Sequence, residues 1–222
     1  KSVLEYLINR LKRSRLAEQI IVATTNKKID QKIVDVVKKL KINSFIGDEL
    51  DVLNRYYQCA KKYKSSIIVR VTSDCPFSDP NLIDDMINFY IKNDYDYISN
   101  TTPLNESHWP DGSDVEIFSY EALVRANNES TNKKEREHVT FYFWKNPNSN
   151  FKTYNYKFIN ENLSKYRFTL DYQEDFMVIN KINDYLLEKG IFGNIDEISK
   201  FLKENPEIMK INSKYFSGIG WK

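Results

Sequence analysis

Two spacings of apolar residues alternate along the first hundred residues of the chain. At 2–13 and 29–41 the apolar residues recur three and four positions apart, as they do on one face of an α-helix. Between these stretches lies the run QIIVATT at 19–25, which is short, apolar and rich in β-branched residues. Such runs are typical of buried strands, so the pattern predicts helix and strand in turn.

The same alternation continues to residue 100. We expect helices at 2–13, 29–41, 51–63 and 81–92, and strands at 19–25, 43–46, 66–72 and 96–100. Strands that alternate with helices in this way favour an α/β fold, with a mostly parallel sheet and helices on its faces.

The rhythm changes after residue 100, where the polar loop TTPLNESHWPDGS interrupts the alternation. Beyond it we expect strands at 115–119, 151–158 and 166–171, and helices at 119–127, 135–145, 173–188 and 194–204. The sequence shows no internal repeat and no low-complexity linker. We therefore interpret the change as the start of a second, substrate-facing half of one domain.

Composition narrows the classes of function. The 222 residues include 33 basic and 31 acidic side chains, so the formal net charge is only +2 and does not favour a nucleic-acid partner. The apolar runs are too short to span a bilayer, and the first residues lack the apolar segment of a signal peptide. The two cysteines, Cys59 and Cys75, have no metal-binding or disulfide spacing. We expect a soluble, cytoplasmic protein without a membrane partner.

Two aspartates directly follow predicted strands. Asp74 ends the run IIVRVTSD, and Asp171 ends the run YRFTLD. In open α/β sheets, ligands bind beyond the carboxyl ends of the strands, and two carboxylates that meet there can hold Mg²⁺. The alternative is that each aspartate only caps the following helix. We interpret Asp79 in that way, because it stands before Pro80.

The stretch PDGSDVE brings further acids together. Asp111 and Gly112 form a turn signal, while Asp114 and Glu116 fall on the same face of a predicted strand. These acids could bind sugar hydroxyls, or they could simply face solvent.

Two other charged groups need an explanation. In KKEREHVTFYFW, Arg136, Glu137 and His138 precede an aromatic-rich helix. Arginine suits carboxylates and phosphates through its planar fork, whereas a single histidine is more often structural. Arg70 lies inside a predicted strand, where an isolated charge is costly, so we expect it to pair with a carboxylate or to face an anion.

Taken as a set, several segments resemble the cytidylyltransferase-type nucleotidyltransferases of the spore-coat polysaccharide biosynthesis group, relatives of the enzymes that make CMP-sialic acid and CMP-Kdo. The matching segments are GDELDVLNRYYQCAKKY, IIVRVTSDCPFSDP, PDGSDVEIFSYEAL, KEREHVTFYFWKNP and RFTLDYQEDF. They occur in the family's order and cover most of the chain, from about residue 2 to 205. Each segment alone is a weak signal, whereas the set is a strong one.

The resemblance implies a glycosyltransferase-A-like fold, CTP as the nucleotide substrate, Mg²⁺ as the cofactor, and an acidic sugar or related acid as the acceptor. Asp74 and Asp171 match the family's metal-binding acids and, with Arg136 and His138, are the catalytic residues that it implies. The nucleotide side would include Gly47, Asp48, Asp51, Arg55 and Ser73. The acceptor side would include Arg70, Asp111, Gly112, Asp114, Glu116, Glu137 and Lys165.

The resemblance also divides the single domain, 1–222, by role. Residues 1–100 would form the nucleotide-binding half, 101–205 the acceptor-binding half and 206–222 a C-terminal tail. Relatives are often dimers, so we expect a homodimer, for which the aromatic residues at 141–158 could supply an interface or could equally be core.

One departure from the family is large. The family opens with a strand and a loop bearing Gly, Arg and Lys that holds the triphosphate, whereas this chain starts within the helix that normally follows. We expect that this strand and loop are missing from the present chain rather than absent from the protein.

Two other classes of function stay open. A glycosyltransferase of the same fold would use a nucleotide sugar and usually an Asp-x-Asp motif, which Ser73-Asp74-Cys75-Pro76 lacks. A non-catalytic nucleotide-binding module is the second alternative, and the missing phosphate loop is its main support.

Overall fold

The strands form two groups in the computed structural model, which describes residues 2–146, 148–157 and 161–215. β1 (Ile21–Thr25) and β2 (Asn43–Gly47) pair in parallel. A second sheet has the order β3-β5-β4-β6, formed by Ile67–Arg70, Glu116–Ser119, Tyr97–Ser99 and Thr153–Asn155. β5 runs antiparallel to both of its neighbours, while β4 and β6 are parallel. Three of these four strands therefore share one direction, as the mixed α/β prediction requires.

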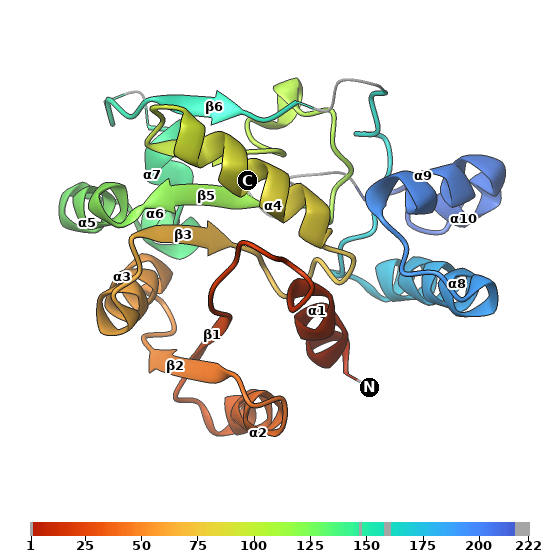
Figure 1. Cartoon of the computed structure of the whole chain (residues 1–222), viewed down its shortest axis with the longest axis horizontal. Coiled ribbons are helices and arrows are strands. Elements are labelled where there is room, and N and C mark those ends of the chain that lie inside the picture. The colour runs from red at the N-terminus through yellow and green to blue at the C-terminus, as the bar shows by residue number, and fades with distance from the viewer. Residues whose placement is uncertain (1, 147, 158–160, 216–222) are drawn as a thin grey trace.

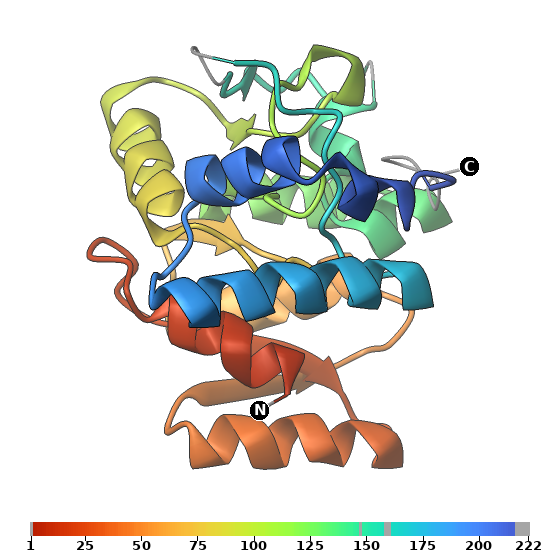
Figure 2. The same cartoon turned by 90° about the vertical axis from the view of Figure 1, so that its right-hand side faces the viewer.

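Helices surround the sheets. They are α1 (Val3–Leu11), α2 (Gln31–Lys39), α3 (Val52–Tyr63), α4 (Pro80–Lys92), α5 (Tyr120–Glu129), α6 (Lys133–His138), α7 (Phe141–Trp144), α8 (Gln173–Lys189), α9 (Ile195–Glu204) and α10 (Pro206–Lys210). Figure 1 shows α4 across one face of the larger sheet, with α8, α9 and α10 grouped beyond the end toward which β3 runs. Figure 2 shows α1 and α8 one above the other, with α2 below both. No helix in the described part of the chain is long and apolar enough to cross a membrane.

Two helix starts follow the capping rules. Asp79 accepts a hydrogen bond from the Asn81 backbone N–H, and Pro80 begins α4, so the prediction of a cap at Asp79 is confirmed. Asp51 caps α3 in the same way, by accepting from the Asn54 backbone N–H at 3.0 Å. The carboxylate of Asp51 is thereby tied to the start of a helix.

Two predicted elements differ from the structure. The helix expected at 135–145 is broken at Val139, whose φ of 56° is incompatible with a continuous α-helix, and it becomes α6 and α7. The strand expected at 166–171 makes only an isolated bridge between Asp111 and Arg167. Its residues bond instead to the loop after β3, since the Leu170 backbone N–H donates to the Asp74 carbonyl at 2.9 Å.

The core has two parts. One lies between the larger sheet, α4, α8 and α9, and includes Met86, Ile98, Phe168 and Ile182. The other packs α3, α5 and α7 around β5, and includes Phe143, which stacks on Tyr97 with ring centres 5.3 Å apart. Burial of each such side chain contributes about 1.5–3 kcal/mol. The aromatic residues of α7 thus belong largely to the chain's own core, which leaves Tyr154 among the exposed candidates for an interface.

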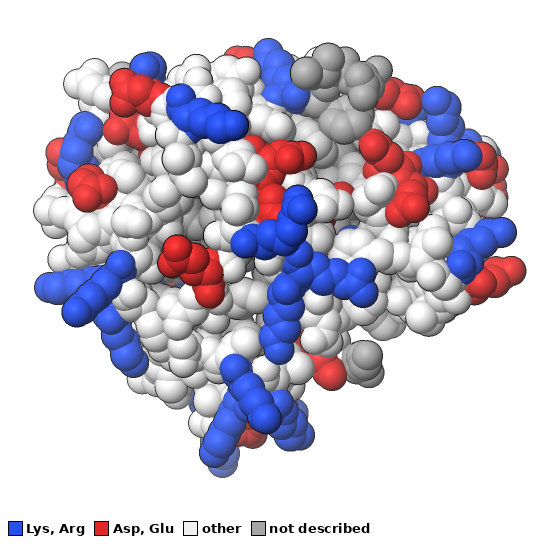
Figure 3. Space-filling model, in the orientation of Figure 1, with Lys and Arg blue, Asp and Glu red and all other residues white. Residues whose placement is uncertain are grey.

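Charges are mixed over the surface. On the face shown in Figure 3, acidic and basic side chains both occur, with a run of basic groups over the lower middle and acidic groups on either side of it. This matches the small net charge of the whole sequence.

Candidate active site

A cavity of about 420 Å³ opens where β3 and β4 end and β5 begins. Its lining joins three loops that are far apart in the sequence: 72–75, 101–114 and 167–172. The residues around it are Arg70, Thr72, Asp74, Cys75, Thr101, Thr102, Asp111, Asp114, Glu116, His138, Thr140, Phe141, Trp144, Arg167, Thr169, Asp171 and Tyr172. Five carboxylates and two guanidinium groups therefore share one polar space.

Asp74 and Asp171 are brought to this cavity from neighbouring segments. The Asp74 carbonyl accepts hydrogen bonds from the Leu170 backbone N–H at 2.9 Å and from the Thr169 hydroxyl at 3.2 Å. These bonds tie the loop after β3 to the segment that carries Asp171. The Asp171 side chain is 44% exposed and accepts from Arg167 Nη2 at 2.7 Å, so part of its carboxylate faces solvent.

Arg167 organises one wall of the cavity. Its guanidinium donates to Asp111 at 2.6 Å, to Asp171 at 2.7 Å, and to both oxygens of Asp175 at 3.1 and 2.8 Å. Burial lowers the pKa of this group, but the hydrogen bonds that it donates to Asp175 and Asp171 and the charge of Asp111 outweigh burial, so the pKa is raised. Arg167 therefore stays charged and fixes three carboxylates at once.

Arg70 forms a second, simpler pair. Its Nη1 donates to Glu116, which also accepts from the Tyr97 hydroxyl at 2.5 Å. The expectation that Arg70 pairs with a carboxylate is confirmed. The buried Nε of Arg70 has no hydrogen-bond partner among the described residues, whereas the Nε of Arg167 donates to Asp175.

Asp114 lies on the same side of the cavity as Asp111. It accepts from the Thr101 hydroxyl at 2.7 Å and from the Gly112 backbone N–H at 3.0 Å. Burial, and then the charge of Asp111, raises the pKa of Asp114 to about 7. Gly112 has a φ of 100°, and an added Cβ would come within 2.6 Å of the Phe168 and Thr169 backbone. Glycine therefore lets this loop approach the Arg167 segment.

His138 reaches the cavity from the end of α6. Its ring stacks on Phe141 with centroids 4.3 Å apart. Burial lowers the pKa of this imidazole below its ordinary value, so the neutral form is favoured.

The sequence profile of the family described as cytidylyltransferase matches residues 1–211, which is nearly the whole chain. The chain belongs to the cytidylyltransferase family. As a member of this family it is a nucleotidyltransferase, and the predicted recognition and enzyme class are confirmed.

Two curated proteins are similar to this chain over most of its length. An uncharacterized protein of Methanocaldococcus jannaschii is 38% identical over 215 residues, which are 96% of this chain and 84% of the relative. The spore coat polysaccharide biosynthesis protein SpsF of Bacillus subtilis is 27% identical, over 92% of this chain and 85% of its own length.

Solved structures agree in fold. A cytidylyltransferase from Leptospira borgpetersenii superposes with a TM-score of 0.86 at 31% identity, covering 94% of this chain and 86% of that one. The CMP:2-keto-3-deoxy-manno-octonic acid synthetase, solved with CTP, reaches a TM-score of 0.57 at 9% identity, covering 85% of this chain and 89% of its own. The second likeness shows the fold alone, which is the glycosyltransferase-A-like α/β fold expected from the sequence.

Arg136 does not line the cavity of this cytidylyltransferase. Its Nε donates to Asp51 at 2.9 Å, and its Nη atoms bond to Asn127 and to the Ser130 carbonyl. The guanidinium therefore joins α6 to the start of α3. The role of Arg136 at the acceptor stays a prediction from the sequence, which did not show this partner 85 positions away.

Three other candidates also lie away from the cavity lining. Ser73, Glu137 and Lys165 are exposed, and none of them is among the residues around the cavity. Lys165 Nζ instead lies 5.1 Å from the centre of the Tyr166 ring. Their expected contacts with nucleotide or acceptor stay predictions.

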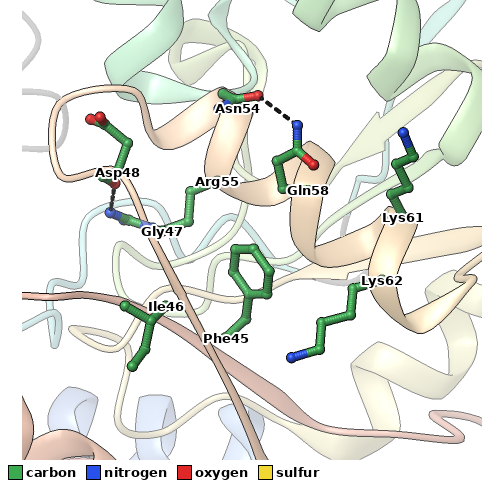
Figure 4. Close-up of a pocket in the computed structure, with 9 residues that line it drawn as sticks. All are labelled: Phe45, Ile46, Gly47, Asp48, Asn54, Arg55, Gln58, Lys61 and Lys62. Atoms are coloured by element: carbon green, nitrogen blue, oxygen red, sulfur yellow. Dashed lines mark hydrogen bonds between the residues drawn. The ribbon is translucent and has the colours of Figure 1, made fainter.

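Three of the five candidates of the nucleotide side line a separate hollow of about 490 Å³ beside β2 and α3. Gly47, Asp48 and Arg55 line it, and Figure 4 shows Arg55 directed at the Asp48 backbone, where its Nη1 donates to the carbonyl at 2.6 Å. An added Cβ on Gly47 would lie 2.7 Å from Arg55 Cγ, so glycine permits this packing. Asp51 is not part of this lining, since it caps α3 and pairs with Arg136.

Sequence reasoning missed Arg167 as the organising cation. The available signal was its position: a charged residue within the apolar run YRFTL, four residues before Asp171. It also missed the threonines and aromatic side chains of the lining, such as Thr101, Trp144 and Tyr172, which no local motif distinguishes.

Proposed function

We propose that the protein transfers the cytidylyl group of CTP to an acidic sugar or a related acid, giving a CMP-sugar and pyrophosphate for surface polysaccharide or glycan synthesis. The observation that carries this proposal is the cavity itself. It combines two aspartates from adjacent segments, Asp74 and Asp171, with an arginine, Arg70, whose Nε has no hydrogen-bond partner among the described residues.

The residues present fit a magnesium ion. Within residues 2–146, 148–157 and 161–215, no group of three or more His, Cys, Asp or Glu side chains could hold a metal by itself. Mg²⁺ in nucleotide enzymes usually takes only one or two carboxylates, with water and substrate phosphates as the other ligands. Asp74 and Asp171 would be those carboxylates, and the ion would offset the charge that develops on the phosphate oxygens.

The acceptor's acid group would bind at Arg70. This guanidinium is charged, because the nearby Glu116 raises its pKa despite burial, and its Nε has no protein partner among the described residues. A carboxylate or phosphonate oxygen in the cavity would bind this guanidinium through a charge-assisted hydrogen bond. Asp114 would accept a hydrogen bond from a hydroxyl group of the acceptor substrate. The cavity wall around Asp114 is rich in oxygen atoms that accept hydrogen bonds, and a hydroxyl group can donate one.

The chemistry is an in-line displacement at phosphorus. A hydroxyl oxygen of the acceptor forms a bond to the α-phosphorus of CTP, the bond from that phosphorus to the bridging oxygen breaks, and pyrophosphate leaves. His138 would take the hydroxyl proton, because its lowered pKa keeps the imidazole neutral and able to accept one. The remaining contribution of the chain is to position the reactants and to exclude water.

The experiment is an assay of pyrophosphate release by the full-length protein with Mg²⁺. CTP, UTP, ATP and GTP are each tested against a panel of acidic sugars and phosphonates. We expect release that requires both CTP and one acceptor class. Release that is equal for all four nucleotides would contradict the base preference, while transfer only from a preformed nucleotide sugar would favour a glycosyltransferase of the same fold.

The assembly belongs to the same proposal. We propose a cytoplasmic homodimer, in which exposed aromatic side chains such as Tyr154 contribute to the contact. Light scattering of the purified protein at several concentrations tests this, and a monomer at all concentrations would contradict it.

A further inference from the structure

The segment that follows α10 returns to the active-site cavity. Asn212 is 1% exposed, and its side-chain amide donates to Asp175 Oδ1 at 2.8 Å and to the Arg167 carbonyl at 3.2 Å. Asn212 therefore holds two residues of the wall that carries Asp171, although it lies 45 positions after Arg167.

Asp175 connects Asn212 to Arg167 and to the backbone of Asp171. Its fully buried carboxylate accepts two hydrogen bonds from the Arg167 guanidinium, and its Oδ2 also accepts from the backbone N–H groups of Asp171 and Tyr172 at 3.1 and 3.0 Å. One carboxylate thus fixes both the cation that binds the Asp171 side chain and the backbone that carries Asp171. Hydrogen bonds in such a buried network reinforce one another.

Tyr215 makes a second contact with the same wall. Its ring stacks on Tyr172 with centroids 3.8 Å apart and an angle of 4° between the planes. Its hydroxyl donates to Glu174 at 3.1 Å. Tyr172 lines the cavity, so the ring of Tyr215 supports a side chain of the active site directly.

We infer that Asn212 and Tyr215 are positioning residues, which hold Asp171 and Tyr172 in the geometry that binds metal-bound CTP. This inference rests on the proposed function, because it takes Asp171 as the residue that would hold Mg²⁺. Without Asn212, Asp175 loses a donor and its hold on Arg167 loosens. The Arg167 guanidinium, which already donates to Asp171 at 2.7 Å, is then free to turn further toward that carboxylate and to compete with the metal for both of its oxygens. Without Tyr215, Tyr172 loses the surface against which it stacks.

Binding measured without turnover is the test. The affinity of the full-length protein for CTP with Mg²⁺, and for Mn²⁺ with CTP, is determined by calorimetry for the wild type, Asn212→Ala and Tyr215→Ala. We expect Kd to rise at least about tenfold for both variants, a loss of hydrogen bonding or stacking equivalent to about 1.4 kcal/mol. Tyr215→Phe keeps the ring and should restore most of the affinity that Tyr215→Ala loses.

Lys214→Ala is the matched control. Lys214 lies between the two positioning residues and is exposed; it pairs with Glu174, and its Nζ lies 5.0 Å from the centre of the Tyr215 ring. Its replacement should leave Kd within about twofold of the wild type, because exposed ion pairs contribute little. The melting temperature of each variant is recorded, so that a loss of folded protein is separated from a loss of affinity.

The outcomes separate the two proposals. If the wild type binds CTP but Asn212→Ala and Tyr215→Ala bind it equally well, with or without a lower melting temperature, the positioning role is wrong and the proposed function stands. If the wild type does not bind CTP with Mg²⁺ at all, the proposed function fails, and the positioning role fails with it.

Discussion

Arg70 and Arg167 line the same cavity, yet their surroundings differ. Arg167 is bonded to three carboxylates, those of Asp111, Asp171 and Asp175. Arg70 has one carboxylate partner, Glu116, and an Nε without a protein acceptor in the described chain. The difference teaches that a cation found in a cavity of this kind need not bind the substrate: the hydrogen bonds of Arg167 to the described residues all go to the wall, whereas we propose that Arg70 binds the ligand.

The largest expected effect comes from removing the side chain of Arg167. Arg167→Ala leaves buried carboxylates without their cation, which should lower the free energy of unfolding by about 3–5 kcal/mol. It should also reduce pyrophosphate release at least about 100-fold, because Asp171 loses its position. Urea unfolding and the release assay measure the two effects. Ser164→Ala, three positions away and exposed, is the control, and an equal loss there would contradict the account.

Arg70→Gln tests the role of the other arginine. Glu116 keeps its hydrogen bond from Tyr97, so we expect a smaller loss of stability than for Arg167→Ala. The KM for the acceptor should rise about 10–100-fold, which corresponds to the roughly 1.5–3 kcal/mol of a hydrogen bond to a charged group. Steady-state kinetics at saturating CTP gives this value. An unchanged KM for the acceptor would show that Arg70, like Arg167, binds only groups of the protein.

Asp114 tests how strongly the crowding of carboxylates in the cavity lowers the stability of the folded protein. Its pKa is raised to about 7 in the fold from 3.8, so the folded state holds a proton that the unfolded state has lost between these values. Stability should therefore fall as pH rises through this window. Because the side chain is only partly buried, we expect about 1–2 kcal/mol rather than the full effect of such a shift. Asp114→Asn should abolish this part of the pH dependence in unfolding experiments at about pH 5 and about pH 8. Parallel pH curves for the two proteins would contradict it.

The smallest effect is expected for Arg136, the arginine that lies outside the cavity. Arg136→Ala removes its bonds to Asp51 and Asn127, which should cost roughly 1 kcal/mol of stability, as for the loss of a helix cap. The rate of pyrophosphate release at saturating substrates should not change. A fall in that rate without unfolding would restore the sequence-based placement of Arg136 at the acceptor.

The local pattern of apolar and polar residues predicted much of the fold. Apolar spacing predicted the alternation of the first hundred residues, and the cap at Asp79 followed from Pro80. The pattern failed where tertiary contacts decide the backbone. The residues of YRFTLD have the composition of a strand, but they bond to the loop of Asp74 and form no ladder. Likewise, Val139 breaks a helix that local propensity would continue.

The site was predictable only in part. Asp74 and Asp171 were found because each ends an apolar run, and Asp114 and Glu116 because period-two spacing puts them on one face. Charge pairing across long sequence separations was not visible. No local pattern distinguishes Arg136 from Arg167. In the folded chain Arg136 pairs with Asp51 and Arg167 pairs with Asp111, and only the fold determines these partners.

The central claim is that the cavity between Asp74 and Asp171 is the site of cytidylyl transfer, rather than the hollow beside β2. The most direct measurement compares CTP-dependent pyrophosphate release by Asp74→Asn and Asp171→Asn with release by Asp48→Asn, a change in that hollow. The account predicts a loss of at least about 1000-fold for the first two, as is typical when a major electrostatic contributor is removed, and near-normal release for the third. Normal release by either cavity variant, or a comparable loss in Asp48→Asn, would contradict it.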